Sequence, residues 1–267
     1  MHAIKSFRLV AHNNVQLAEF YHAIGFEIGT PGPIAPEEMA LLGLMGQGTR
    51  LPMKLGPSAV DLDTYDHPGQ PYPAEINGAD TLFQHLALVT TDIATAWAQA
   101  IAAGATPISR NGPIQLPASS GSVIAAKFRD PEGHPLEFLQ FPAGSNPAWP
   151  GTGTLGIDHS AISVADTTRA IAFYERHGLT LGPRGTNTGP TQVALDDIDN
   201  VTVQIVPLLP SHTPAHLELL GYRNAHSHKP WNPNDIAATR IVWHADHTTL
   251  LRDEDGHLHQ LQPAQHL

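Results

Sequence analysis

Histidines and carboxylates are the residues of this sequence that could support metal or acid–base chemistry. The chain has 17 His, 25 Asp and Glu residues taken together, and no Cys. Without cysteine, disulfide bonds, thiolate nucleophiles and zinc sites built on cysteine are excluded. Any metal ion must therefore be bound by His, Asp or Glu side chains.

Two of the histidines occupy matching positions in an internal repeat. His85 stands seven residues before Asp92, and His159 stands seven residues before Asp166. Each Asp is expected to cap a helix that follows a strand. The equivalent positions of four repeat units follow one another at intervals of 79, 74 and 80 residues, and they are Ser6, His85, His159 and Thr239.

Each unit also closes on a strand that carries a polar residue inside an apolar run. This residue is Glu137 in HPLEFLQF and Glu218 in AHLELLGY. Because side chains alternate between the two faces of a strand, each carboxylate points away from its apolar neighbours. The other two units have Asp61 in SAVDLDTY and Gln260 in HLHQLQP. Only the second and third units therefore hold both a His and a Glu.

The helices and turns of the repeat have a structural explanation. The Phe-Tyr pairs at 20–21 and 173–174 are predicted to lie on the buried side of amphipathic helices, each followed by a glycine that can end the helix. The phrases DPEGH and DEDGH are predicted to be tight turns. Their histidines, His134 and His257, are accordingly expected to be turn or surface groups.

Composition narrows the class of protein and of partner. With 41% apolar and 15% charged residues the chain is expected to be globular. Its formal charge of −11 disfavours nucleic acid and anionic membranes as partners. No stretch is long and apolar enough to span a bilayer, and no secretory leader is evident. We expect a cytoplasmic monomer or homodimer that binds a small molecule.

The repeated modules resemble a known superfamily. Strand, helix and three strands closing on an acidic residue, with FRDPEGHPLEFLQF and IDHSAISVADTTRAIAFYERHGL as the clearest phrases, resemble the vicinal oxygen chelate proteins. These include glyoxalases, bleomycin-resistance proteins and extradiol dioxygenases. The resemblance implies an α+β fold of four βαβββ modules, the fourth truncated, which pair into two curled mixed sheets around a cleft. The expected modules are 1–66, 80–142, 157–222 and 236–267, grouped into an N-terminal half (1–142) and a C-terminal half (157–267).

The resemblance also implies a ligand set. In enzymes of this superfamily, a divalent metal is bound by side chains from the first and last strands of two paired modules. The matching residues here are His85, Glu137, His159 and Glu218. Two imidazoles and two carboxylates suit Zn, Fe(II), Mn, Ni or Co, and they leave about two octahedral positions open.

Two pairings of the modules are open. Sequential pairing, typical of extradiol dioxygenases, would divide the His and Glu residues between two incomplete sites. Crosswise pairing, as in single-chain glyoxalases of four modules, would collect all four in one site between modules two and three. We favour crosswise pairing, because modules one and four would then form a pair without a metal, and the fourth could lose its helix. That second pair would keep Ser6, Asp61, Thr239 and Gln260.

The expected function is that of a metal-dependent lyase or isomerase of the glyoxalase or epimerase kind. The metal would stabilise an enediolate, and Glu137 or Glu218 would move the proton. An extradiol-type Fe(II) dioxygenase is the alternative if one Glu is not a ligand. A metal-free, ligand-sequestering protein of the drug-resistance type is a further alternative. A glutathione thioester, a coenzyme A ester, a catechol and a small hydroxyacid are all open as substrates.

Overall fold

The computed structural model describes residues 1–212 and 215–263, which form a mixed α+β fold of repeated modules. Module one contains β1 (Ala3–Val10), α1 (Asn14–Ala23), β2 (Glu27–Ile28), β3 (Gly32–Pro33), α2 (Pro36–Leu41), β4 (Gly48–Leu55) and β5 (Ser58–Tyr65). Module two contains β6 (Gln84–Thr90), α3 (Ile93–Ala102), β7 (Thr106–Pro107), β8 (Ile114–Gln115), a 3₁₀ turn η1 (Ala118–Ser120), β9 (Ile124–Arg129) and β10 (Pro135–Gln140).

The third module repeats this order, and the fourth is shorter. Module three contains β11 (Thr154–Ser163), α4 (Thr167–Arg176), β12 (Thr180–Leu181), β13 (Gly185–Thr188), α5 (Pro190–Asp196), β14 (Thr202–Leu209) and β15 (His216–Tyr222). Module four contains β16 (Arg240–His244), β17 (Thr249–Arg252) and β18 (Leu258–Gln262). The described part of module four thus has three strands and lacks the helix.

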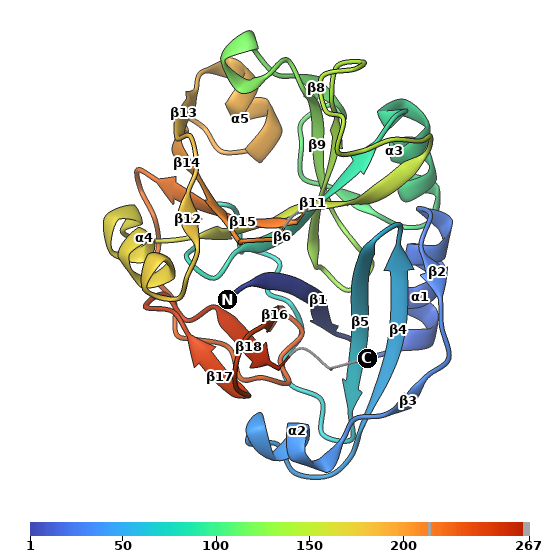
Figure 1. Cartoon of the computed structure of the whole chain (residues 1–267). Helices are drawn as coiled ribbons and strands as arrows, with labels where there is room; N and C mark the ends of the chain where they lie inside the picture. The colour runs from blue at the N-terminus through green and yellow to red at the C-terminus, as the bar shows by residue number, and fades with distance from the viewer. Residues whose placement is uncertain (213–214, 264–267) are drawn as a thin grey trace.

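The modules pair crosswise. One sheet has the order β17-β18-β16-β1-β5-β4-β2 and joins module four to module one, with β3 beside β4. The other has the order β12-β14-β15-β11-β6-β10-β9-β7 and joins module three to module two, with β13 beside β14 and β8 beside β9. We call them the 1–4 sheet and the 2–3 sheet; they occupy the lower and upper halves of Figure 1. Their central contacts are the antiparallel pairs β1·β16 and β6·β11.

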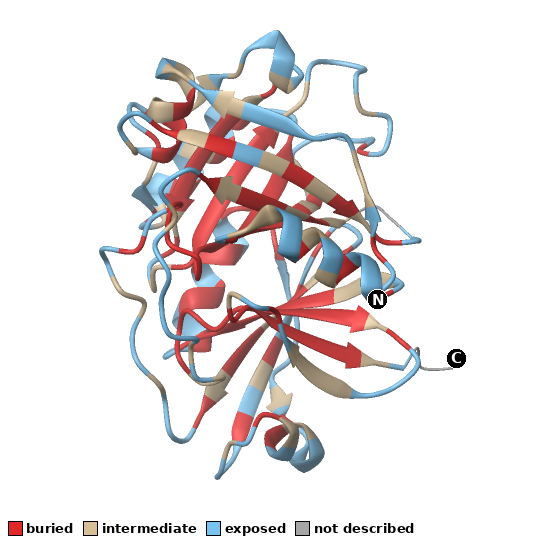
Figure 2. Ribbon diagram, turned by 90° about the vertical axis from the view of Figure 1, so that its left-hand side faces the viewer, coloured by how far each residue is buried: buried red, intermediate tan, exposed pale blue. Residues whose placement is uncertain are grey.

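One apolar core holds the two sheets together. Leu9 and Trp243 from the 1–4 sheet and Leu88 and Ile162 from the 2–3 sheet belong to the same buried cluster. The central strands of both sheets are buried along most of their length (Figure 2). In the described residues no helix is long and apolar enough to cross a membrane.

Two tyrosines also connect the sheets. Tyr21 on α1 donates a hydrogen bond of 3.0 Å to Asp130 in the turn before β10, and so links module one to module two. Tyr174 on α4 donates a 2.7 Å bond to Asp253 in the turn before β18, and so links module three to module four. All four side chains are buried. The repeated Phe-Tyr and Asp-x-x-Gly-His phrases are therefore the two halves of one repeated contact.

The two histidines belong to the turns, as predicted, but they are buried in the same contact, so the alternative that they are surface groups was wrong. His134 is 1% exposed and lies between Asp130, 2.7 Å from Nδ1, and the carbonyl of Val10, 3.0 Å from Nε2. His257 is 4% exposed, and its Nε2 donates to the carbonyl of Ser163 at 2.9 Å. The turn explains why the Asp-x-x-Gly-His sequence recurs, but it does not predict which strand packs against the histidine.

Removing either tyrosine hydroxyl should destabilise the fold. Tyr21→Phe and Tyr174→Phe each remove one donor to a buried carboxylate, which costs about 1 to 2 kcal/mol in the free energy of unfolding. Urea denaturation followed by circular dichroism measures this loss. Tyr72→Phe is the matched control, because the buried hydroxyl of Tyr72 has no hydrogen-bond partner among the described residues. Equal losses in all three variants would contradict the assignment.

Candidate functional site

The four residues singled out in the sequence meet on the 2–3 sheet. Glu218, His159, His85 and Glu137 lie on β15, β11, β6 and β10, which are consecutive strands at the centre of that sheet. All four side chains line one cavity of about 260 Å³. Crosswise pairing is what brings them together, since two come from module two and two from module three.

Three of the four form a tight cluster. The donor atoms of His85, Glu137 and His159 lie within 4.8 Å of one another. Glu137 Oε2 is 3.0 Å from Nε2 of His85 and 4.0 Å from Nε2 of His159. Glu218 approaches from the other side, with Oε1 at 3.8 Å from His159 Nε2. It stands just outside the three-residue cluster.

The strand register explains the space between these side chains. Ala87 on β6 is directly level with Glu137 on β10 and with His159 on β11. Ala161 on β11 is level with His85 on β6 and Glu218 on β15. An alanine therefore stands between His159 and Glu137, and another stands between His85 and Glu218. Because the alanine side chain is only a methyl group, it leaves room above the sheet for an ion.

The ring nitrogens of the cluster fit a metal. Three buried ring nitrogens have no hydrogen-bond partner among the described residues. They are Nδ1 and Nε2 of His85 and Nε2 of His159. The 3.0 Å approach of His85 to Glu137 is a close contact without hydrogen-bond geometry. Buried polar atoms are normally paired, so the two unpaired Nε2 atoms that lie near the carboxylates indicate a missing partner. A divalent cation is the partner that imidazole and carboxylate share.

In the metal-free site the two histidines differ in charge. Burial lowers the pKa of His85 to about 4, although Glu137 acts in the opposite direction. Burial also lowers the pKa of His159, but the carboxylates of Glu218 and Asp158 outweigh it and raise that pKa to about 9. At pH 7 the free site therefore holds neutral His85 and protonated His159, which must release its proton to bind a cation.

The orientation of His159 is fixed by a neighbour that the sequence pattern did not single out. Nδ1 of His159 donates to Asp158 at 3.0 Å, and the indole N–H of Trp149 donates to the other oxygen of Asp158 at 3.2 Å. A register shift at 157–159 accompanies this arrangement. Metal-binding histidines typically have such a carboxylate on the second nitrogen. Asp158, His159 and His216 form a second possible cluster, but both oxygens of Asp158 already accept N–H groups.

A buried ion pair stands at the cavity wall, where its lysine lines the cavity, and no sequence pattern pointed to it. Lys127 on β9 lies directly opposite Glu137, and its Nζ is 2.7 Å from Asp196 on α5. Tyr222 donates to the same carboxylate at 2.9 Å. Burial raises the pKa of Glu137, but Lys127 and His85 outweigh it and lower that pKa to about 2. Glu137 is thus held as a carboxylate.

The 1–4 sheet has the same register but different residues. Strand pairing places its counterparts of His85, Glu137, His159 and Glu218 at Ser6, Asp61, Arg240 and Gln260. The prediction of Thr239 as the fourth of these residues was wrong by one residue. The seven-residue spacing was counted back from an Asp that caps a helix. Asp246 caps no helix in the truncated module, so the spacing does not locate the equivalent strand position there.

An arginine occupies the place that the ion would have in the 2–3 sheet. Arg8 is the counterpart of Ala87, and its guanidinium lies 3.3 Å from Asp61 and 2.8 Å from Gln260. It also pairs with Glu38 of α2. The closing-strand residues of this sheet are therefore already bound to a cation supplied by the chain itself.

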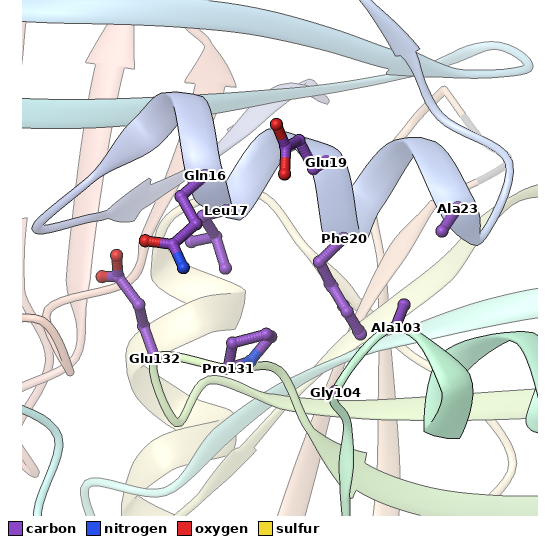
Figure 3. A pocket seen from close by; sticks show the side chains of 9 residues that line it. All are labelled: Gln16, Leu17, Glu19, Phe20, Ala23, Ala103, Gly104, Pro131 and Glu132. Atoms are coloured by element: carbon purple, nitrogen blue, oxygen red, sulfur yellow. The ribbon is translucent and has the colours of Figure 1, made fainter.

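A larger surface cavity lies elsewhere and has a structural origin. It measures about 590 Å³ and lies between α1, the end of α3 and the turn before β10 (Figure 3). Of the described residues that line it, none belongs to the His–Glu cluster. Glu132 at its edge accepts the backbone N–H groups of His12 at 2.7 Å and Asn13 at 3.0 Å. Its carboxylate is thus occupied in holding the start of α1.

Comparison with solved structures shows the same arrangement over the whole chain. A glyoxalase I variant from Zea mays is 16% identical, with a TM-score of 0.63, and the match covers 98% of this chain and 92% of that chain. A proposed dioxygenase from Bacillus subtilis is 11% identical, with a TM-score of 0.54, over 97% of this chain and 84% of that chain. No protein-family profile and no curated protein sequence matches the chain. At these identities the likeness establishes the fold, and the chain is therefore a four-module protein with the vicinal oxygen chelate fold.

Proposed function

We propose that this protein is a divalent-metal-dependent isomerase or lyase. Its substrate would carry oxygens on two neighbouring carbon atoms, and the reaction would take place at one of these carbons. His85, Glu137, His159 and Glu218 would hold the ion. The observation that carries the proposal is the cluster of unpaired histidine nitrogens and carboxylates around the alanine-lined gap of the 2–3 sheet. The whole-chain likeness to glyoxalase I supports it by analogy of fold only.

The ion and the protein would have separate tasks. When bound, a divalent ion supplies Lewis acidity, which polarises a substrate oxygen and makes the neighbouring C–H group more acidic. Asp158 holds His159 so that its Nε2 faces the cavity. The apolar side chains that line the cavity would limit the access of water to the reacting carbon and so strengthen the electrostatic contacts there.

We assign the proton transfer to Glu218. Glu137 is the more enclosed carboxylate, with a side chain 7% exposed, and its pKa of about 2 makes it a weak base. The side chain of Glu218 is 15% exposed and stands outside the three-residue cluster. A carboxylate at the open side of the site can move between the ion and a substrate C–H group. Glu137 is then the permanent ligand.

A second candidate function has an observation in its favour. The cluster of His85, Glu137 and His159 taken alone is a set of two histidines and one carboxylate, as in non-haem Fe(II) oxygenases. Glu218 would then lie near the ion without binding it, and the protein would be an extradiol-type dioxygenase. The two functions differ in whether the loaded protein consumes oxygen.

Metal content tests both functions. We expect the untagged protein to bind one equivalent of divalent metal, measured by plasma mass spectrometry after dialysis. His85→Ala and Glu137→Gln should weaken binding by more than about 100-fold, because the loss of an outer-shell partner alone costs about 10- to 100-fold. Gln260→Ala, the counterpart of Glu218 in the 1–4 sheet, is the control and should keep full occupancy. Near-zero metal in every sample would rule out both enzymes and favour a metal-free binding protein.

Filling the gap between the ligands should abolish metal binding while every ligand stays in place. Ala87→Arg copies Arg8 of the 1–4 sheet, and its guanidinium can pair with Glu137 and Glu218. Calorimetric titration with Zn²⁺ should show no binding to this variant. Ala87→Val is a smaller change that fills the same gap, and it serves if the arginine variant fails to fold. A folded Ala87→Arg protein that binds Zn²⁺ like the wild type would show that the ion lies elsewhere.

Oxygen uptake separates the two functions. We expect the protein loaded anaerobically with Fe(II) to consume no oxygen above the metal-only blank when it is mixed with 4-methylcatechol, as followed by an oxygen electrode. Stoichiometric uptake with a yellow ring-cleavage product would instead establish the dioxygenase. Glu218→Gln gives an internal check, since it should leave any dioxygenase activity largely intact.

A further inference from the structure

One wall of the cavity is a continuous apolar surface. Leu116, Val123, Leu139, Phe141 and Leu195 all line it, and they belong to one hydrophobic cluster that is separate from the main core. Four of them come from module two, and Leu195 comes from α5 of module three. Leu116 and Phe141 are only partly buried and present apolar surface to the cavity. Burial of that surface by a ligand would be favourable by about 25 cal/mol for each Å².

The polar part of the same cavity repels anions. Glu137, Glu218 and Asp158 line it, so a divalent ion would leave the group with one net negative charge when His159 is neutral. Lys127 also lines the cavity, but its ammonium is committed to Asp196 at 2.7 Å. An anionic substituent in the cavity would therefore face carboxylates at low dielectric, where repulsion is strong.

The volume adds a limit on size. Cavities for drug-sized ligands measure about 300 to 1,000 Å³. At about 260 Å³ this one lies below that range. A ligand that this cavity encloses must be small.

We infer that the substrate is a small molecule with oxygens on two neighbouring carbon atoms and an uncharged, apolar body. This body packs against the wall of Leu116, Val123 and Phe141. This rests on the proposed function, because the two oxygens are the part that would reach the ion. Glutathione thioesters carry two carboxylates and coenzyme A esters carry several phosphates. Both are disfavoured by the charge and the volume of the cavity.

Two pairs of probes that differ in one substituent test the inference. The first pair is 4-tert-butylcatechol and 3,4-dihydroxybenzoate, which offer the same two oxygens with an apolar or an anionic tail. It is measured by calorimetry on the Zn²⁺-loaded protein. The second pair is 4-tert-butylphenol and 4-hydroxybenzoate on the metal-free protein. We expect the apolar member of each pair to bind at least tenfold more tightly.

Variants locate the binding surface. Phe141→Ala and Leu116→Ala should each weaken binding of the tert-butyl probes by about tenfold, since each removes part of the apolar wall. Neither should change Zn²⁺ affinity, because neither is a ligand. Leu250→Ala removes a half-buried leucine of the 1–4 sheet and is the matched control, with unchanged binding expected.

The outcomes distinguish this inference from the proposed function. Absence of Zn²⁺ binding refutes the proposed function, and the phenol pair then still reports the preference of the cavity. Equal or tighter binding of the carboxylate member in either pair overturns the inference. So does apolar binding that is unaffected by Phe141→Ala and Leu116→Ala.

Discussion

The antiparallel pairing of β6 with β11 is the contact on which the candidate site depends. It joins modules two and three and sets Ala161 opposite His85, and Ala87 opposite His159. Because side chains of one face repeat every second residue, a shift of this register by one residue would place the two histidines on opposite faces of the sheet. The two carboxylates then follow from β10 and β15, which pair in parallel with the same two strands.

Both sheets carry buried polar and acidic side chains that need a cation, but the cation differs between them. Polar residues of the closing strands converge on the concave face of each sheet, and buried carboxylates need a cation. In the 1–4 sheet Arg8 supplies that cation from the chain, with Asp61 and Gln260 as its partners. In the 2–3 sheet alanine replaces the arginine, and two histidines face the carboxylates with unpaired nitrogens. One sheet is closed by its own ion pairs, and the other keeps room for an ion.

The α5 helix gives the open sheet its chemical character. Asp196 of α5 pairs with Lys127, and the ammonium of Lys127 stands beside Glu137 and, with His85, holds Glu137 ionised. Leu195, the preceding residue, completes the apolar wall. The helix thus contributes both to the charged surroundings of the proposed ion and to the apolar wall that can take the body of a ligand. The proposed reaction and ligand binding would both take place in this one cavity.

Much of this was predictable because it is local or periodic. The spacing of His85 and His159 before their helix caps, and the single Glu in each closing strand, identified the modules and the cluster residues. The truncation of the fourth module followed from its length. These features depend on strand alternation and capping, which act within a few residues.

The sequence by itself determined the modules, their elements and the His and Glu residues worth testing. Only the tertiary structure decided that modules pair crosswise, that Arg240 rather than Thr239 is the counterpart of His159, and that Arg8 fills the second site. The buried contacts of His134 and the roles of Asp158 and Lys127 also became visible only there. The physical reason is that strand register and packing join residues far apart in the chain, so no local pattern records which partner each will meet.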